Sequence, residues 1–329
     1  MNKFIFLKKS LYYINKANNE LDIIKEKTGV CKFLIFIDLI WCYIRYGILL
    51  RQYIKGGFYL RKSWERKNIV TFLWHRKMRL SVNNPDYEHF FEVKSDFNDF
   101  FSDYIGRDWL LLDTSSKCAS FEEFFNFIKT HTSFLVKPLT EQQGHGIYKV
   151  DKVNDVNQMY HMLIQKNVLV EEIISQHKGM IFGNASVNTI RVYTVINSRG
   201  KANILKCILR AGVGNSVVDN YAAGGSIYQV DNDYGIVVTK GFSKYKDDNL
   251  FHPGTDIVML GYKVPNWDCV KMMVMNAAEK IPEVRYVGWD VAITEQGCLL
   301  IEGNHDPDYE LLEFVGDREY IPKIQSFLK

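Results

Sequence analysis

The sequence lacks the features that mark several classes of protein. Its six cysteines form no C-x-x-C pair and no zinc-like spacing with histidine, and the chain shows no internal repeat or low-complexity run. The phosphate-binding pattern G-x-x-x-x-G-K-[ST] is absent. Scattered cysteines in a chain of 329 residues are typical of buried thiols in a reducing compartment. The sequence therefore excludes a disulfide-rich miniprotein and a P-loop protein.

An excess of one charge is also missing. The 41 basic and 38 acidic residues leave +3, which is poor support for nucleic-acid binding because that requires a basic stripe. The apolar fraction of 47% and the charged fraction of 24% are close to the averages of globular proteins, which excludes a collagen-like fibre and a disordered chain. Aromatic residues are plentiful at 14% and can fill a large core. At ~100–200 residues per domain, the length predicts two domains or one large one.

One apolar run, residues 33–50, raises the question of membrane contact. A spanning helix needs ~20 apolar residues, and this shorter run is interrupted by Asp38 and Arg45. We therefore expect a buried amphipathic helix. The alternative that the sequence leaves open is a helix that docks on a membrane surface or on a membrane enzyme, since Lys32 and Arg51 flank the run.

The hydrophobic spacing changes along the chain. Residues 1–85 carry apolar side chains at helical spacing, and residues 86–130 also favour helices, one of them capped by Ser120 and Glu123. From about residue 132 the pattern favours strands with mostly antiparallel pairing. The strands that we expect are 133–138, 167–172, 186–197, 203–211, 235–239, 285–293 and 297–303, and the helices are 155–165 and 268–280. The pattern predicts an α+β fold.

A predicted hairpin near the C-terminus carries polar side chains on one face. A three-residue loop places Thr294 opposite Cys298. In that register Asp290 lies opposite Glu302 at ~5 Å, and Asn304 shares their face two residues further on. Carboxylate and amide oxygens are hard ligands suited to Mg²⁺. The hairpin therefore predicts a metal site, with a solvent-facing polar pair as the alternative.

Two further segments place polar groups at strand ends. Lys137 ends an apolar strand and leads into a loop with Gly144 and Gly146, where main-chain N–H groups and the lysine can bind phosphates. Another apolar strand ends in Glu171 and Glu172, for which the plainer interpretation is the polar end of a buried strand.

A fourth segment pairs two arginines with a glycine-containing loop. Arg191 and Arg210 lie on neighbouring predicted strands and precede a loop with Asn220, Gly224 and Gly225. Arginines on neighbouring strands usually bracket an anion or a carboxylate. Surface salt bridges are the alternative.

The order of these segments resembles that of ATP-grasp enzymes. Lys-Pro with a glycine loop is followed by Glu-Glu, R-V-x-x-V, a second arginine, N-x-x-x-G-G, G-x-D and E-x-N. The resemblance extends from about Lys94 to Pro307. The segments 175–177, 186–191, 218–220 and 288–290 are most similar to the sugar-transfer-associated ATP-grasp branch found among bacterial capsule and O-antigen proteins.

The resemblance implies an α+β ATP-grasp fold in which two subdomains clasp ATP. It divides the chain into a helical N-terminal region at residues 1–85, a small subdomain at 86–172, and a large subdomain with the metal hairpin at 173–329. Many ligases of this superfamily follow E-x-N with a small-residue turn. This chain has His-Asp-Pro-Asp instead, and either Asp306 or Asp308 is our candidate to orient a cationic amine.

The resemblance also implies two cofactors, ATP and Mg²⁺, and a role for each matching residue. The nucleotide-binding residues it implies are Lys94, Lys137, Gly144, His145, Gly146, Glu171, Glu172, Ile173 and Ile174. The catalytic residues it implies are Arg191, Arg210 and Asn220, and the magnesium ligands are Asp290, Glu302 and Asn304.

Three functions agree with these features. The first is an ADP-forming ligase that joins an amine or amino acid to a carboxylate, such as a uronic acid of a polysaccharide precursor, through an acyl phosphate. The second is a sugar kinase with His145 or His177 as general base. The third is an ATP-binding accessory protein of a glycosyltransferase complex. We favour the ligase because of the metal hairpin and the paired arginines. The presence of every expected metal and phosphate residue argues against an accessory protein.

The sequence also supports expectations about location and partners. The first ten residues contain no small-residue cleavage site, so we expect no signal peptide and a cytoplasmic protein with no transmembrane span. Peripheral contact at the inner membrane face is left open. We expect a small-molecule or sugar-linked carboxylate and an amine as substrates, polysaccharide-assembly enzymes as partners, and no nucleic acid.

Overall fold

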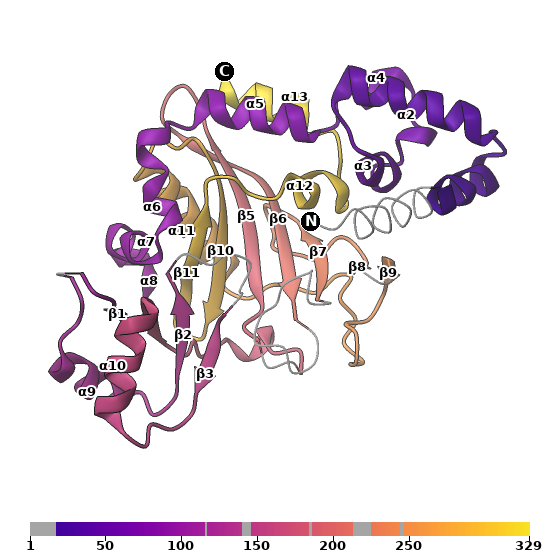
Figure 1. Cartoon of the computed structure of the whole chain (residues 1–329). Helices are drawn as coiled ribbons and strands as arrows, with labels where there is room; N and C mark the ends of the chain where they lie inside the picture. The colour runs from indigo at the N-terminus through magenta and orange to yellow at the C-terminus, as the bar shows by residue number, and fades with distance from the viewer. Residues whose placement is uncertain (1–17, 116, 140–145, 184–185, 213–224, 244–246) are drawn as a thin grey trace, which may run out of the picture. The chain divides into compact units, whose positions relative to one another are not determined.

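The computed structural model describes residues 18–329 except 116, 140–145, 184–185, 213–224 and 244–246. The chain divides into two compact units (Figure 1). The helical unit is Met1–Ser81 with Asp308–Gln325, and the sheet unit is Val82–Pro307 with Ser326–Lys329. The division into residues 1–85, 86–172 and 173–329 stays a prediction.

The helical unit contains short helices around a small apolar core. Its helices are a segment at residues 18–28, α2 (Lys32–Tyr46), α3 (Leu50–Lys55), η1 (Phe58–Leu60), α4 (Ser63–Arg66), α5 (Phe72–Val82), α12 (Tyr309–Phe314) and α13 (Tyr320–Leu328). Ile35 and Cys42 of α2 pack against Tyr53 and Phe58, which are fully buried. The predicted helical N-terminal region is therefore confirmed over its described residues.

A buried carboxylate helps to join the C-terminal segment to this unit. The side chain of Glu313 is fully buried and accepts hydrogen bonds from the main-chain N–H groups of Val70 (3.1 Å), Glu319 (2.6 Å) and Tyr320 (3.2 Å). A buried carboxylate is stable only when it is paired or hydrogen-bonded in this way. Glu313 thus connects two segments that are far apart in the sequence.

The sheet unit begins with a four-stranded antiparallel sheet. Its strands are β1 (Trp109–Leu112), β2 (Phe134–Pro138), β3 (Tyr148–Val150) and β4 (Val168–Glu172), in the order β1-β4-β2-β3. Two helices, α9 (Phe121–Thr130) and α10 (Val156–Lys166), pack on it around Phe124 and Leu163, which are fully buried. The predicted capping box of α9 is confirmed: Ser120 Oγ accepts the Glu123 N–H, and Glu123 accepts the Ser120 N–H.

A seven-stranded antiparallel sheet follows, in the order β11-β10-β5-β6-β7-β8-β9. Its strands are β5 (Thr189–Ile196), β6 (Ala202–Ala211), β7 (Ser226–Val230), β8 (Gly241–Phe242), β9 (Asp247–Asn249), β10 (Tyr286–Thr294) and β11 (Gly297–Asn304). The other elements are η2 (Pro85–Tyr87), α6 (His89–Glu92), α7 (Lys94–Phe100), α8 (Ser102–Ile105), η3 (Lys178–Met180) and α11 (Trp267–Glu279). Helix α11 lies along β5, β6, β10 and β11.

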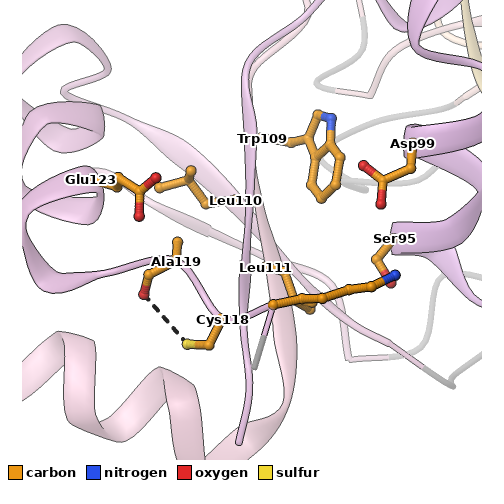
Figure 2. A pocket seen from close by; sticks show the side chains of 9 residues that line it. Ser95, Asp99, Trp109, Leu110, Leu111, Cys118, Ala119 and Glu123 are labelled. Carbon is orange, nitrogen blue, oxygen red and sulfur yellow. Dashed lines mark hydrogen bonds between the residues drawn. The ribbon is translucent and has the colours of Figure 1, made fainter. Parts of the chain in front are cut away.

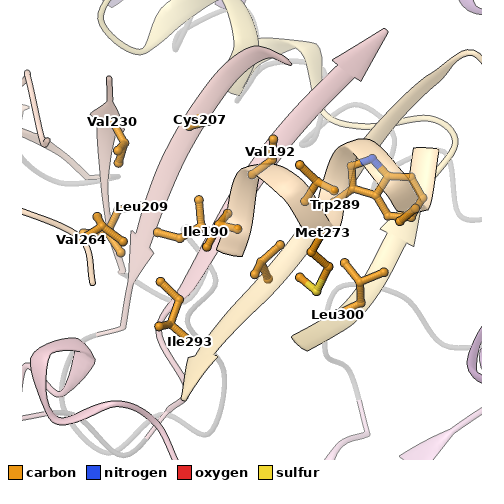
Figure 3. Close-up of a cluster of buried hydrophobic side chains, with 14 of the residues drawn as sticks. Ile190, Val192, Cys207, Leu209, Val230, Val264, Met273, Trp289, Ile293 and Leu300 are labelled. Carbon is orange, nitrogen blue, oxygen red and sulfur yellow. The ribbon is translucent and has the colours of Figure 1, made fainter. Parts of the chain in front are cut away.

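The largest apolar core lies between this sheet and α11 (Figure 3). Ile190 and Val192 of β5, Leu209 of β6 and Trp289 of β10 point into it, and Met273 of α11 joins them. Alternate residues of each strand therefore face the core, and the residues between them face the opposite side.

Most of the predicted strands are confirmed, but two expectations are wrong. In place of a strand at 235–239, only Ile236 and Val237 form isolated bridges, because Gly235 turns the chain with φ +70°. Strand β1 lies within residues 86–130, which were expected to be helical. Its four residues are too short a pattern to distinguish a strand from a buried helical turn.

None of the helices among the described residues is both long enough and apolar enough to cross a membrane. Helix α2, which covers most of the apolar run at 33–50, has fifteen residues.

Candidate functional site

The hairpin of β10 and β11 brings two carboxylates face to face. Asp290 pairs with Glu302, as the sequence predicted. The predicted loop is nevertheless wrong, because Thr294 pairs with Gly297 and not with Cys298. The connection is therefore a two-residue loop, which by itself would shift every later pair by one residue.

A β-bulge corrects this shift. Val291 pairs with Leu300, whereas the preceding Asp290 pairs with Glu302, so Ile301 is an extra residue on β11. Bulges commonly occur beside functional sites, where they redirect a side chain. Here the bulge places Glu302 beside Asp290 despite the shorter loop.

Four charged side chains form a row across β11, β10, β5 and β6. Glu302 is paired with Asp290, and Asp290 with Arg191. Arg210 lies on β6 two residues beyond Ile208, which is the partner of Arg191. We call these four residues the arginine–carboxylate row. Since the residues on either side of Arg191 face the core with α11, the row occupies the opposite face of the sheet.

Both arginines bind the same carboxylate. Arg191 contacts Asp290 through two hydrogen bonds, Nε to Oδ1 at 2.5 Å and Nη2 to Oδ2 at 2.8 Å, and Arg210 Nη1 lies 2.8 Å from Oδ2. Asp290 is buried, with 4% of its side chain exposed. Burial alone would raise its pKa, but the charges of Arg191 and Arg210 outweigh burial and hold the pKa of Asp290 well below its usual range.

The second carboxylate responds in the opposite way. The Glu302 residue is exposed overall, but its carboxyl group is shielded from water. This burial and the adjacent charge of Asp290 raise the pKa of Glu302, and the charge of Arg191 opposes the shift. Asn304 Nδ2 donates a hydrogen bond of 3.3 Å to Glu302. Two repelling carboxylates and an amide oxygen are the donor set of a hard divalent cation, which would relieve the repulsion. The residues therefore fit Mg²⁺.

A second charged cluster lies at the small sheet. Lys137 Nζ on β2 lies 2.5 Å from Glu171 Oε2 on β4, and Arg107 Nε lies 2.9 Å from the same oxygen. Lys137 and Glu171 are both buried, and Asn98 Nδ2 donates to the other Glu171 oxygen at 3.4 Å. Burial by itself would raise the pKa of Glu171, but Arg107 and Lys137 hold it far below the usual range.

Arg107 connects this cluster to the hairpin. Its Nη1 donates to the main-chain carbonyl of Leu300 at 2.7 Å, and its Nη2 donates to that of Ile301 at 3.4 Å. These carbonyls lie at the bulge, immediately before Glu302. The sequence analysis missed Arg107, because a single arginine in a loop before a short strand forms no motif; only the folded chain places it between two sheets.

The remaining nucleotide-binding candidates lie around β2 and β4. Lys94, at the start of α7, donates to the carbonyls of Pro138 (2.9 Å) and Leu139 (3.3 Å), which follow Lys137. Glu172 accepts the Asp108 N–H at 3.1 Å. The half-buried Ile173 and Ile174 follow β4 outside regular structure.

Three candidates cannot be placed. Gly144, His145 and Asn220 lie outside the described residues. Gly146 is described and has φ +73°, a left-handed conformation that glycine adopts without strain. It lies two residues before the start of β3.

Other features of the described residues share only Glu172 with the predicted site. A hollow of about 290 Å³ lies between α7, β1 and the start of α9, and it is lined by Trp109, Asp99 and Lys117 among others (Figure 2). Two groups of side chains lie close enough together to hold a metal. They are Glu88, Glu92 and His305, and Asp108, His131 and Glu172.

The sequence match identifies the family to which this geometry belongs. Residues 109–329 match the family described as sugar-transfer associated ATP-grasp. The chain belongs to this family. Its fold is accordingly the ATP-grasp fold, an α+β arrangement preceded by a helical N-terminal region, as the sequence predicted. No curated protein matches the sequence.

Solved structures resemble this ATP-grasp protein only distantly. N5-carboxyaminoimidazole ribonucleotide synthetase, in its ADP complex, has a TM-score of 0.39 at 9% identity, covering 66% of this chain and 45% of its own. D-alanyl-alanine synthetase A from Vibrio cholerae has a TM-score of 0.40 at 15% identity, covering 72% of this chain and 65% of its own. D-alanine-D-alanine ligase from Coxiella burnetii has a TM-score of 0.41 at 10% identity, covering 72% of this chain and 52% of its own. This chain thus spans less than two thirds of each.

Proposed function

We propose that this protein is an ADP-forming carboxylate–amine ligase that works through an acyl phosphate. Family membership supports an ATP-dependent reaction. The observation that carries the proposal is the arginine–carboxylate row, which joins two guanidinium groups and a potential magnesium site on one face of the large sheet. Phosphoryl transfer needs mainly positioning and charge stabilisation, and this row supplies both.

We assign the nucleotide to the segment around β2 and β4. Lys137 and Lys94 lie together at the end of β2 and provide positive charge for the phosphates. Glu171 acts on the nucleotide only indirectly, because its buried carboxylate holds Lys137 in place. Glu172, Ile173 and Ile174 follow as the adenine-binding segment, and the loop that contains Gly144, His145 and Gly146 covers the phosphates. Such a cover protects an acyl phosphate from water.

We assign the transfer step to the row. Asp290 fixes the planar guanidinium groups of Arg191 and Arg210, whose remaining N–H donors stabilise negative charge on the transferred phosphoryl group. Asn220 completes the catalytic set in this proposal. Bound Mg²⁺, held by Asp290, Glu302 and Asn304, would offset the charge of the phosphates.

We propose an amine or amino acid and a carboxylate, such as a sugar-linked uronic acid, as the substrates. The family description associates these proteins with sugar transfer, which supports a role beside polysaccharide-assembly enzymes of capsule or O-antigen synthesis. We place the reaction in the cytoplasm, where ATP is available. The kinase alternative is less favoured, because His177 accepts the Gly179 N–H through Nδ1 and faces Glu295 at 3.4 Å, which gives it a structural role.

The experiment that tests this proposal measures ADP and phosphate release from Mg²⁺-ATP. Pooled amino acids are combined with pooled uronic acids or nucleotide-sugar uronates. We expect release only when both pools are present, and at least a hundredfold loss in Glu302→Gln. Glu295→Gln, a matched change in the loop of the same hairpin, should retain wild-type activity.

Three results would contradict the proposal. AMP and pyrophosphate would indicate another chemistry, a stable phosphorylated sugar without free phosphate would indicate a kinase, and equal activity in Glu302→Gln would remove the metal assignment. ATP binding without turnover, also with lipid-linked acceptors, would favour an accessory protein.

A further inference from the structure

The outer face of helix α2 is apolar and exposed. Its side chains alternate with the inward-facing Ile35, Asp38, Leu39 and Cys42, and none of them is charged. We define the outer face as Phe33, Leu34, Phe36, Ile37, Ile40, Trp41, Tyr43 and Ile44. Each is at least 44% exposed, and Ile44 reaches 77%. So many neighbouring apolar side chains exceed ordinary surface scatter and mark a contact surface.

The acidic residue of this helix does not interrupt the outer face. Asp38 turns inward, where Arg66 contacts its two oxygens at 2.7 and 2.9 Å and the Tyr53 hydroxyl donates to it at 2.6 Å. In the sequence, Asp38 argued against a helix that spans a bilayer. In the folded chain its charge is balanced on the protein side of the helix.

The positive charge of the sequence is concentrated in its N-terminal part, which contains α2. Residues 1–81 contain 17 Lys and Arg against 5 Asp and Glu, a net charge of +12. The remaining residues, 82–329, contain 24 Lys and Arg against 33 Asp and Glu, a net charge of −9. The overall value of +3 therefore conceals a strongly basic N-terminal segment. Such asymmetry between two parts of a chain points to an anionic surface as partner.

Apolar area and positive charge together select the partner. We propose that the outer face of α2 docks on an anionic lipid bilayer. Aromatic side chains such as Phe36, Trp41 and Tyr43 are favoured at the lipid–water interface, and a helix of this kind lies ~5–10 Å deep in it. A second copy would bring two segments of +12 together, and a nucleic acid would not cover eight apolar side chains.

The test is co-sedimentation of the full chain with lipid vesicles. The vesicles are phosphatidylcholine alone, or phosphatidylcholine with phosphatidylglycerol. We expect the wild-type protein to sediment with the anionic vesicles at least tenfold more strongly, and 0.5 M NaCl to weaken this binding. The double variant Phe33→Glu/Ile44→Glu should lose at least tenfold in binding. Met272→Glu, a similar change at an exposed site of α11 in the sheet unit, should bind as the wild type does.

Circular dichroism of each variant shows whether the helices are intact. Equal binding by the double variant, or no binding of the wild type to anionic vesicles, overturns the proposal. A dimer that the double variant dissociates, without lipid binding, assigns the outer face to a second copy and also overturns it. Glu302→Gln should sediment like wild type, because docking does not depend on the proposed reaction.

Discussion

At the scale of residues, the two carboxylates of the hairpin differ in what surrounds them. Asp290 is buried and is bound by two arginines, so its charge is required by the fold. Glu302 is exposed and opposes another acid, so its charge adds little to stability. Both were predicted as metal ligands, but only the structure shows that one of them also fixes the guanidinium groups.

This difference predicts effects of unequal size on stability. Asp290→Asn should lower the free energy of unfolding by about 3–5 kcal/mol, because it leaves the charges of Arg191 and Arg210 unbalanced. Glu302→Gln should change it by less than about 1 kcal/mol, because the site is exposed and repulsion is removed. Urea unfolding at pH 7 measures both values. A Glu302→Gln variant as unstable as Asp290→Asn would contradict the geometry.

At the scale of elements, strand pairing assembles both charged clusters. Lys137 and Glu171 come from β2 and β4, and the row comes from four strands of the large sheet. Arg107 joins the clusters, since it contacts Glu171 and the carbonyls at the bulge of β11. A change in the register of either sheet would separate the charged partners.

The small-sheet cluster predicts a pH dependence of stability. The pKa of Glu171 is lower in the folded chain than its unfolded value of 4.5. The stability that the ionised carboxylate contributes is therefore fully present above pH 4.5 and is lost as the pH falls below that value. Glu171→Gln should lower the free energy of unfolding by about 3–5 kcal/mol at pH 7. The difference in free energy of unfolding between wild type and variant should become smaller between about pH 5 and pH 3.

Urea unfolding at several pH values measures this difference. Glu172→Gln is the matched control, since its remaining side-chain oxygen can still accept the Asp108 N–H. We expect it to change stability by less than about 1 kcal/mol at pH 7. A constant difference between wild type and Glu171→Gln from pH 7 to pH 3 would show that Glu171 is not ion-paired.

At the scale of the whole molecule, the arginine–carboxylate row of the proposed site is balanced in charge. The two carboxylates of the row are matched by its two arginines, and the cluster of Lys137, Glu171 and Arg107 has an excess of one positive charge. Mg²⁺ alone therefore gains little from binding, whereas Mg²⁺ with an anionic nucleotide brings compensating charge.

This balance predicts that metal and nucleotide stabilise the protein together. A ligand at a concentration of a hundred times its Kd adds about 2.7 kcal/mol to the free energy of unfolding. For a unit of this size that should raise the melting temperature by about 5–10 °C. Differential scanning fluorimetry should show this shift with Mg²⁺-ATP, less than about 1 °C with Mg²⁺ alone, and a reduced shift in Glu302→Gln. A full shift with Mg²⁺ alone would refute the argument.

Local pattern determined much of this protein in advance. Alternation of apolar residues predicted the strands that carry Lys137, Glu171, Arg191 and Asp290, and helical spacing predicted the N-terminal region. The order of motifs predicted the family. These features depend on neighbours within a few residues, which a sequence displays directly.

Contacts between distant segments were decided only by the tertiary structure. The bulge at Ile301 depends on how β11 meets β10, and the position of Arg107 depends on two sheets meeting across more than 190 residues of chain. Whether Asp38 faces protein or solvent depends on the placement of Arg66. Side chains find such partners through packing of whole elements, because burying a charge is tolerated only where the fold supplies its counter-charge.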